Sequence, residues 1–276
     1  MSFEMNFSGK NVVVIGGTSG INRGIAELFA AKGANVAVAS RSQDKVDDTV
    51  KALEALGAKA HGFAADVRNF EDIEAGIAKI AELWGSIDVL VSGAAGNFPA
   101  FAKDMSTNAF KSVVDIDLLG TFHVMKAAYD HLTRPGASII NISAPQAFLP
   151  MSAQAHVCSA KAGVDMITRC LAMEWGPEGI RINSIVPGPI DGTEGMRRLA
   201  PTPELMEMSR ESVPTKRLGL PEDIANAAAY LASPAASYVN GIVMPVDGGW
   251  HLSGASSLST TLGDMLQQMI DMQKKS

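Results

Sequence analysis

The feature that most constrains this chain is an apolar stretch, a glycine-rich turn and a helical pattern near the N-terminus, VVVIGGTSGINRGIA at residues 12–26. Its first four residues are β-branched and apolar, which is typical of a strand buried on both faces. Gly16, Gly17 and Gly20 follow at once, and apolar residues then recur at helical spacing. In this order the backbone N–H groups at the helix N-terminus can bind a pyrophosphate, and any Cβ in the turn would keep the phosphates away. The stretch therefore predicts a nucleotide-binding site.

The rest of the chain repeats the strand–helix unit. Further strands are predicted over residues 35–39, 58–64, 87–91, 138–142, 180–185 and 242–246, and further helices over 45–56, 70–84, 108–132, 152–175 and 221–231. Uniformly apolar strands that alternate with helices are typical of a parallel sheet covered on both faces. We therefore predict an α/β fold of the Rossmann type, a doubly wound parallel sheet of seven strands with its ligands beyond the C-terminal strand ends.

Length and composition favour one enzyme-sized domain. No Pro/Ser-rich linker divides the 276 residues, so a single dinucleotide-binding domain is predicted over 1–276. The net charge of −6 argues against a nucleic-acid partner, and no apolar run or N-terminal signal pattern indicates a membrane partner. Cys158 and Cys170 fall on one predicted helix roughly 18 Å apart, too far for a disulfide. A reducing cytoplasm is the expected setting.

Arg41 bears on the choice of nucleotide. An acidic residue about 20 positions after the glycine turn binds the adenosine 2′-hydroxyl, whereas an arginine suits a 2′-phosphate. Here the second strand ends in Ser40-Arg41-Ser42, which predicts NADP(H) rather than NAD(H), because a guanidinium binds phosphate through two parallel bonds. The alternative is a solvated loop arginine. Asp66 and Val67, after the third strand, are expected beside the adenine, unless Asp66 is a helix N-cap.

Motifs along nearly the whole chain resemble the short-chain dehydrogenase/reductase family: GGTSGIN (16–22), Asp66-Val67, AAG (94–96), Ala160-Lys161, RIN (181–183), PGP (187–189) and DGG (247–249). The resemblance implies NADP(H) contacts at Gly16, Thr18, Ser19, Gly20, Ile21, Asn22, Arg41, Ser42, Asp66, Val67, Ala94, Ala95, Gly96, Lys161, Pro187, Gly188 and Ile190. Ile15 stands where the family usually has threonine. Asn22 replaces the third glycine of the turn, and its side chain is expected to crowd the pyrophosphate.

The catalytic positions of the family are altered. Members usually carry Ser, Tyr and Lys, with Tyr four residues before Lys. Lys161 is present, but Val157 occupies the tyrosine position and Ala144 the serine position. Asp117 stands where the family usually places a helix-bending asparagine. Without a phenol, ordinary ketone reduction loses its proton donor.

A narrower resemblance fits these losses. The stretches AAGNF (94–98), NAFKSVVDIDLLGTF (108–122), HVCSAK (156–161), EWGP (174–177) and PGPIDGTEGMRRL (187–199) resemble the 2,4-dienoyl-CoA reductases of the peroxisomal type. The resemblance covers residues 10–250 and implies NADPH-dependent reduction of 2,4-dienoyl-CoA to 3-enoyl-CoA by a homotetramer. The chain ends in QKKS, without the SKL peroxisomal address.

This chemistry explains the missing phenol. Hydride adds to the far carbon of the diene, charge moves onto the thioester oxygen, and a positioned water can deliver the proton to carbon. The resemblance implies that Lys161 orients the cofactor and that Asp117, linked to it through water or the nicotinamide ribose, holds the proton-donating water. His156 is a candidate for that same water or for the thioester. The alternative is that Asp117 only caps a helix kink and His156 is a satisfied surface histidine.

Substrate contacts are expected from two segments. Asn97 and Phe98 are candidates for the acyl pocket, or simply a loop asparagine and a core phenylalanine. A substrate loop is predicted over 188–215, in which Arg197 and Arg198 are candidates for the coenzyme A phosphates, or solvated surface arginines. No metal site is predicted, because no metal-ligand spacing or carboxylate partner is visible for His61, His123, His131 and His251.

The Met-rich segment 259–274 is predicted to form an amphipathic tail helix that packs on a neighbouring subunit. Two other functions stay open. One is a reductase of the same fold that acts on an enoyl thioester or an unusual carbonyl. The other is a non-catalytic NADP(H)-binding sensor or scaffold, against which Lys161 argues because its place beside the nicotinamide ribose matters most for turnover.

Overall fold

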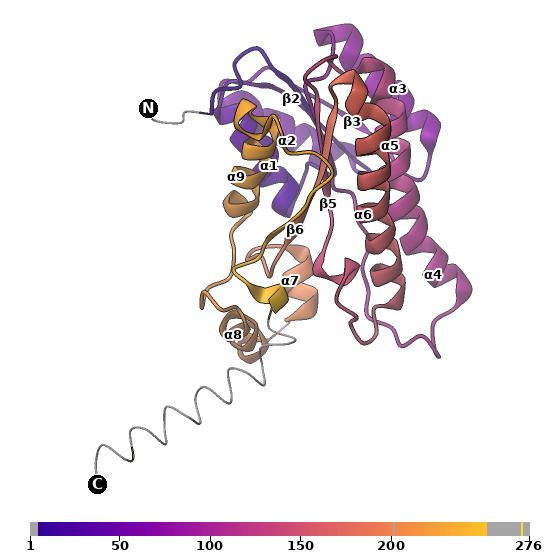
Figure 1. Cartoon of the computed structure of the whole chain (residues 1–276), viewed down its shortest axis with the longest axis vertical. Helices are drawn as coiled ribbons and strands as arrows, with labels where there is room; N and C mark the ends of the chain where they lie inside the picture. The colour runs from indigo at the N-terminus through magenta and orange to yellow at the C-terminus, as the bar shows by residue number, and fades with distance from the viewer. Residues whose placement is uncertain (1–4, 201, 253–271, 273–276) are drawn as a thin grey trace.

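The structure, a computed structural model, describes residues 5–200, 202–252 and 272. Within these residues a parallel sheet of seven strands lies between two layers of helices (Figure 1). The strands are β1 (Asn11–Ile15), β2 (Asn35–Ser40), β3 (Ala60–Ala64), β4 (Val89–Ser92), β5 (Ser138–Ile142), β6 (Arg181–Pro187) and β7 (Val243–Val246). Their order across the sheet is β3-β2-β1-β4-β5-β6-β7, so β2 and β3 lie on one side of β1 and the strands from β4 to β7 lie on the other. The predicted doubly wound Rossmann-type sheet is confirmed.

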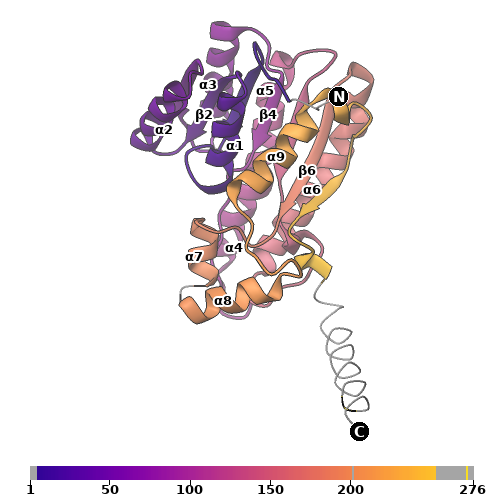
Figure 2. The same cartoon turned by 90° about the vertical axis from the view of Figure 1, so that its left-hand side faces the viewer.

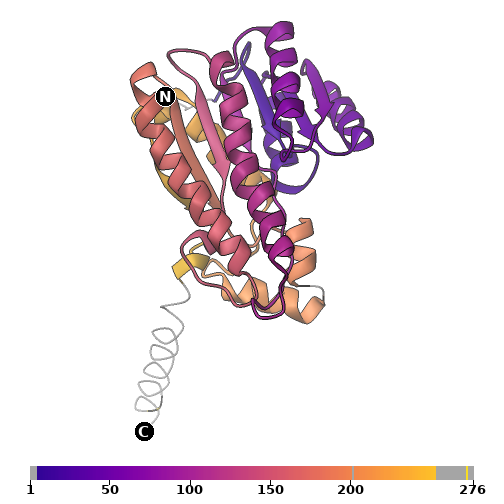
Figure 3. The same cartoon turned by 90° about the vertical axis from the view of Figure 1, so that its right-hand side faces the viewer.

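Helices cover both faces of the sheet (Figures 2 and 3). One face carries α1 (Gly20–Ala31), α2 (Gln43–Ala55) and α9 (Pro221–Ala232), and the other carries α3 (Phe70–Trp84), α5 (Gly120–Ala128) and α6 (Ala155–Trp175). Because side chains alternate along a strand, Val12 and Val14 of β1 enter one apolar core and Val13 and Ile15 enter the other. This is why the strand is apolar at every position from 12 to 15.

The helix predicted over 108–132 is confirmed as a continuous helical segment, but it is not α-helical throughout. The segment consists of α4 (Thr107–Val113), a π-helical turn (Val114–Leu119) and α5, and a 3₁₀ turn follows at Tyr129–His131. A π-helical turn inserts an extra residue into the helix and is frequent at functional sites. Here it carries Asp117, the residue that replaces the family's helix-bending asparagine.

Two short helices lie within the predicted substrate loop, α7 (Glu194–Leu199) and α8 (Pro203–Ser212), and other 3₁₀ turns span Pro145–Ala147, Gly176–Glu178, Pro234–Ala236 and Trp250–Leu252. None of the described helices is both long and apolar enough to cross a membrane. Cys158 and Cys170 both lie on α6 as free thiols. The tail helix predicted over 259–274 lies, except for Met272, outside the described residues.

Candidate functional site

The turn after β1 packs closely against the backbone of the loop after β4. Gly16 has φ +79°, and a Cβ there would lie 2.9 Å from the amide nitrogen of Ala94, in the loop after β4. A Cβ at Gly17 would lie 2.7 Å from the carbonyl oxygen of Val14. Glycine is therefore required by the left-handed conformation and by the close approach of two chain segments. The turn leads directly into α1, which begins at Gly20.

A cavity of about 840 Å³ opens beyond the C-terminal ends of β1, β2 and β4. Its lining brings together most of the predicted site residues: Gly16, Thr18, Ser19, Asn22, Arg41, Ser42, Asp66, Val67, Ala94, Ala95, Gly96, Asn97, Phe98, Arg197 and Arg198. These residues come from segments between positions 15 and 198, so the fold gathers them at one edge of the sheet, as expected for a doubly wound α/β protein.

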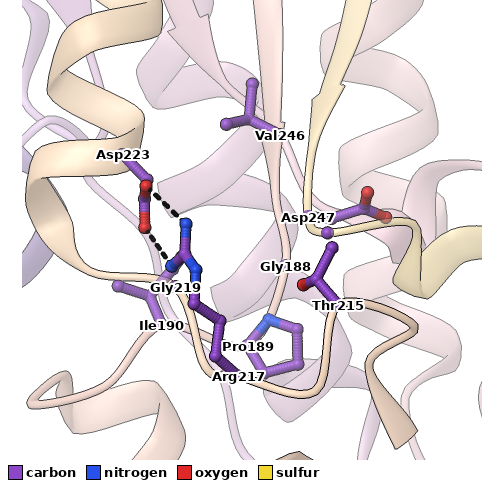
Figure 4. A pocket seen from close by; sticks show the side chains of 10 residues that line it. Gly188, Pro189, Ile190, Thr215, Arg217, Gly219, Asp223, Val246 and Asp247 are labelled. Carbon is purple, nitrogen blue, oxygen red and sulfur yellow. Dashed lines mark hydrogen bonds and ion pairs between the residues drawn. The ribbon is translucent and has the colours of Figure 1, made fainter.

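Other predicted cofactor residues lie elsewhere. Gly188 and Ile190, after β6, line a smaller cavity of about 110 Å³ (Figure 4). That cavity also contains Arg217, whose guanidinium donates to both carboxylate oxygens of Asp223 at 2.7 and 2.9 Å. Gly20, Ile21 and Pro187 line neither cavity.

Arg41, directly after β2, and Lys45, in the first turn of α2, are two cations at the edge of the large cavity. Arg41 and Lys45 are exposed and line the large cavity, and neither forms an ion pair with any described residue. Ser42 caps α2, since its hydroxyl accepts from the backbone N–H of Lys45 at 3.5 Å. Lys45 is a residue that the sequence motifs missed. These cations, with the glycine turn, fit a dinucleotide that carries an extra phosphate on its adenosine ribose.

Asp66 is not the N-cap of α3, because Asn69 occupies that position. Its carboxylate instead pairs with Arg68 at 2.5 Å. The hydrogen bonds from Arg68 hold the pKa of Asp66 below its ordinary value. Asp66 therefore stays ionised beside the cavity.

Asn22 does not project freely into the turn. Its side chain is buried, and its Nδ2 donates to the carbonyl oxygen of Gly93 at 2.8 Å. A Cβ at Gly93 would lie 2.3 Å from that nitrogen. Asn22, which replaces the family's third glycine, thus links α1 to the loop after β4 by a hydrogen bond. The crowding expected from the sequence is reduced, because the amide is directed to Gly93.

Asp117 and Lys161 form a buried ion pair. Asp117 is 1% exposed, and its Oδ2 lies 3.3 Å from Nζ of Lys161. Nζ also donates to the carbonyl oxygen of Ile142 at 3.0 Å. The contact is direct, whereas we had expected water or ribose between the two groups. A buried charge is tolerated only when it is paired, and this pair meets that condition.

The second carboxylate oxygen of Asp117 connects the pair to the cavity. Oδ1 accepts from the backbone N–H of Gly96 at 2.7 Å, and Gly96 lines the cavity. Oδ2 is buried and accepts no hydrogen bond from any residue that the structure describes. Asp117 therefore positions the 94–96 loop with one oxygen and keeps an acceptor available on the other.

His156 is fully buried, so the alternative of a surface histidine is wrong. Its ring lies 4.5 Å, centroid to centroid, from the ring of Phe98. Neither ring nitrogen has a hydrogen-bond partner among the described residues, and the same holds for Oδ1 of Asn97. Buried polar atoms usually have partners, so these atoms mark a place for a polar ligand or water. Asp117, Lys161 and His156 adjoin the cavity through Gly96 and Phe98 but do not line it.

The two arginines of α7 are not simply solvated. Arg197 and Arg198 both pair with Glu194, at 2.9 and 3.0 Å. Arg198 also donates to the carbonyl oxygen of Asn97 at 3.0 Å, across 101 positions of sequence. Glu194 was missed by the sequence motifs, although its i,i+3 and i,i+4 spacing to the arginines was visible. The two arginines hold the pKa of Glu194 below its ordinary value.

A second missed pair lies after β7. His251 Nδ1 is 2.7 Å from Oδ2 of Asp247, four residues earlier. The i,i+4 spacing was the available signal for this carboxylate partner. Among the described residues, no group of three or more His, Cys, Asp or Glu side chains has the arrangement of a metal site.

Comparisons with known proteins agree with this geometry. The family model described as enoyl-(acyl carrier protein) reductase matches residues 16–251. The peroxisomal 2,4-dienoyl-CoA reductase of Saccharomyces cerevisiae is 43% identical over 251 residues, which are 89% of this chain and 86% of the yeast protein. The peroxisomal 2,4-dienoyl-CoA reductase of Rattus norvegicus is 44% identical, over 87% of this chain and 83% of the rat protein. A short-chain dehydrogenase from Burkholderia cenocepacia, solved in complex with NADP, superposes with a TM-score of 0.82 at 27% identity, over 89% of this chain and 99% of that one.

Proposed function

This chain belongs to the short-chain dehydrogenase/reductase family, and from that premise we propose that it is an NADPH-dependent 2,4-dienoyl-CoA reductase that forms 3-enoyl-CoA. The observation that carries the proposal is the buried Asp117–Lys161 pair, in a chain with Ala144 and Val157 at the usual serine and tyrosine positions. A ketone reductase needs a phenol at the carbonyl oxygen, whereas a dienoyl thioester takes its proton at carbon.

We assign the cofactor to the large cavity. Its lining at the glycine turn and the loop after β4 comprises Gly16, Thr18, Ser19, Asn22, Ala94, Ala95 and Gly96, and Asp66 and Val67 adjoin the adenine. Gly20 and Ile21, outside this lining, are assigned by the family resemblance alone. Arg41 and Ser42 bind the 2′-phosphate, and the unpaired Lys45 supports this assignment by adding a second cation. Pro187, Gly188 and Ile190 are assigned by the family resemblance alone. Bound NADPH supplies the hydride that adds to the far carbon of the diene.

The protein's part in protonation rests on Asp117. Lys161 is the counter-ion of the buried Asp117 carboxylate, with Nζ 3.3 Å from Oδ2. Gly96 fixes Oδ1, so Oδ2 is available to hold the water that delivers a proton to the carbon beside the thioester. Asn97 and His156, with unpartnered buried polar atoms, bind the thioester or this water, and Phe98 shapes the acyl pocket. Arg197 and Arg198 bind the coenzyme A phosphates.

The test is NADPH consumption with a dienoyl-CoA, an enoyl-CoA and a 3-oxoacyl-CoA in parallel. We expect turnover on the dienoyl-CoA, with the 3-enoyl product identified by mass spectrometry and NMR. Turnover on the ketone alone would contradict the proposal and indicate another reductase of this fold. Tight NADPH binding without turnover on any of the three would indicate the sensor.

We further propose that the chain is one domain, with its substrate loop over 188–215, and that it assembles as a homotetramer. Exposed apolar side chains on and beside α5 and α6 support self-association: Leu119, Phe122, Met166 and Met173. Met166→Glu should lower the sedimentation coefficient, whereas Leu83→Glu, at an equally exposed apolar position on α3, should not. Unchanged sedimentation of the Met166 variant would contradict an interface on this face.

The proposed setting is the cytoplasm. It is supported by two free cysteines that sit apart on α6. The yeast and rat relatives are named as peroxisomal enzymes. Fractionation of cells that express the full chain, with the organelle pellet and the soluble fraction assayed separately, decides between the two compartments.

A further inference from the structure

Two pairs of cations line the large cavity, and they differ in their counter-ions. Arg41 and Lys45 form no ion pair with any described residue. Arg197 and Arg198 share Glu194, one on each carboxylate oxygen: Nη2 of Arg197 lies 2.9 Å from Oε2, and Nε of Arg198 lies 3.0 Å from Oε1. Glu194 also lines the cavity. The chain therefore places its own anion at one of its two cationic sites.

Helix α7 is held over the cavity by contacts that do not involve this carboxylate. Arg198 Nη1 donates to the carbonyl oxygen of Asn97 at 3.0 Å. Thr193 caps α7 through its hydroxyl, and its methyl group would lie 3.5 Å from a Cβ at Gly20. Removal of the Glu194 charge thus leaves both the cap and the Arg198–Asn97 contact in place.

We propose that Glu194 is an exchangeable counter-ion, which occupies Arg197 and Arg198 until the phosphates of a coenzyme A thioester replace its carboxylate. This inference rests on the proposed function and adds to it a residue that lowers the affinity for the coenzyme A phosphates. Glu194, Arg197 and Arg198 are 58%, 63% and 57% exposed at the side chain. Ion pairs with this exposure are weak, so exchange costs little. A phosphate offers more charge and three acceptor oxygens, so it competes successfully.

Only a substrate that carries phosphates can take part in this exchange. A thioester of a short, uncharged thiol cannot displace Glu194 and gains nothing from the two arginines. The coenzyme A nucleotide can displace it, and its net gain is reduced by the competing carboxylate. Since the arginines hold the pKa of Glu194 low, the carboxylate competes throughout the neutral range.

The experiment measures binding of adenosine 3′,5′-bisphosphate by calorimetry to protein saturated with NADP⁺, so that the cofactor site is blocked. Glu194→Gln should bind the bisphosphate roughly 3–5-fold more tightly than the parent, the size expected for an exposed pair. The matched control is Glu207→Gln, which removes a carboxylate at the same i,i+3 spacing from Arg210, outside the cavity lining. The control should leave the dissociation constant unchanged.

A double-mutant cycle tests whether the effect of Glu194→Gln depends on Arg197 and Arg198. In an Arg197→Gln/Arg198→Gln background, binding should weaken and the effect of Glu194→Gln should vanish. Equal affinity of parent and Glu194→Gln would overturn the inference, as would a gain that persists without the arginines or no bisphosphate binding at all. Dienoyl-CoA turnover by the parent tests the proposed function separately. If the parent is active and Glu194→Gln leaves the bisphosphate affinity unaltered, only the proposal that Glu194 is an exchangeable counter-ion is overturned. Thermal unfolding with NADPH checks that each variant is folded.

Discussion

The glycine turn and the Asp117–Lys161 pair both adjoin the loop at residues 94–96, but the first is a backbone structure and the second is a pair of charged side chains. The turn depends on backbone, because a Cβ at Gly16 would lie 2.9 Å from the amide nitrogen of Ala94. The pair is two buried charges that come from segments 44 positions apart. The first kind of site is damaged when atoms are added, and the second when a charge is removed. Substitutions at the two sites are therefore expected to act differently on stability, NADPH binding and turnover.

Lys161→Ala should have the broadest effect. It leaves Asp117 as an uncompensated buried charge, which costs about 3–5 kcal/mol of folding free energy. NADPH affinity and turnover should fall together. Urea unfolding and NADPH fluorescence titration measure these effects, with the exposed Lys126→Ala on α5 as the control. Loss of turnover at parental stability would mean that Lys161 does not balance Asp117.

Asp117→Asn should reduce turnover on the dienoyl substrate by about 10²–10⁴-fold, the range typical of a general acid–base group. The amide oxygen can still accept from Gly96, so NADPH affinity should stay near the parental value. Asp115→Asn, two residues away at a side chain that is 22% exposed and paired with Lys111, is the control and should keep its activity. Near-normal turnover of Asp117→Asn would make Asp117 a structural residue.

Arg41→Ala tests the choice of nucleotide beside the glycine turn. Hydrogen bonds to a charged group contribute about 1.5–3 kcal/mol, so the KM for NADPH should rise roughly 10–100-fold. The KM for NADH should change little, because NADH lacks the 2′-phosphate. If NADPH kinetics were unaltered and NADH worked equally well, the assignment of Arg41 would be wrong.

Gly16→Ala, with Gly57→Ala as its control, isolates the close approach of the backbone. Both glycines have positive φ, +79° and +87°, and a left-handed alanine costs about 1–2 kcal/mol. Only Gly16 also faces Ala94, whereas a Cβ at Gly57 meets nothing within 4 Å. Gly16→Ala should therefore cost more stability than the control and weaken NADPH binding. Equal losses in both variants would mean that the contact with Ala94 is relaxed easily.

Asp165→Asn should give the smallest change and concerns a carboxylate that forms no ion pair within 4 Å with the residues that the structure describes. Asp165 is buried on α6, and burial raises its pKa above the ordinary 3.8, although the hydroxyls of Ser143 and Ser184 and the charges of Arg169 and Lys161 act in the opposite direction. Because the folded-state pKa is the higher one, the stability contribution of this group is full below pH 3.8 and is lost as the pH rises through the folded-state value.

The Asp165→Asn variant should therefore match the parent in acid and gain stability relative to it toward neutral pH. Urea unfolding across that range measures the difference, and the exposed Asp130→Asn serves as the control. A variant that is less stable than the parent at neutral pH would show that the ionised carboxylate stabilises the fold.

Most of the fold and the nucleotide-binding edge were predictable, because the signals are local. The apolar run at 12–15 must be buried on both faces, and seven such runs that alternate with helices leave few topologies. The motif residues then meet at one edge, since parallel strands end together. The interruption of the 108–132 helix was not predictable, because a π-helical turn depends on what packs around it.

The sequence by itself determined the order of strands and helices, the glycine turn, and the absence of a serine and a tyrosine from the catalytic positions. Only the tertiary structure decided the contacts between distant segments: Asp117 with Lys161 and Gly96, Asn22 with Gly93, and Arg198 with Asn97. The physical reason is the distance along the chain over which each kind of interaction acts. Periodicity and backbone conformation act over a few residues, whereas the partner of a buried charge or amide is fixed by the packing of whole elements.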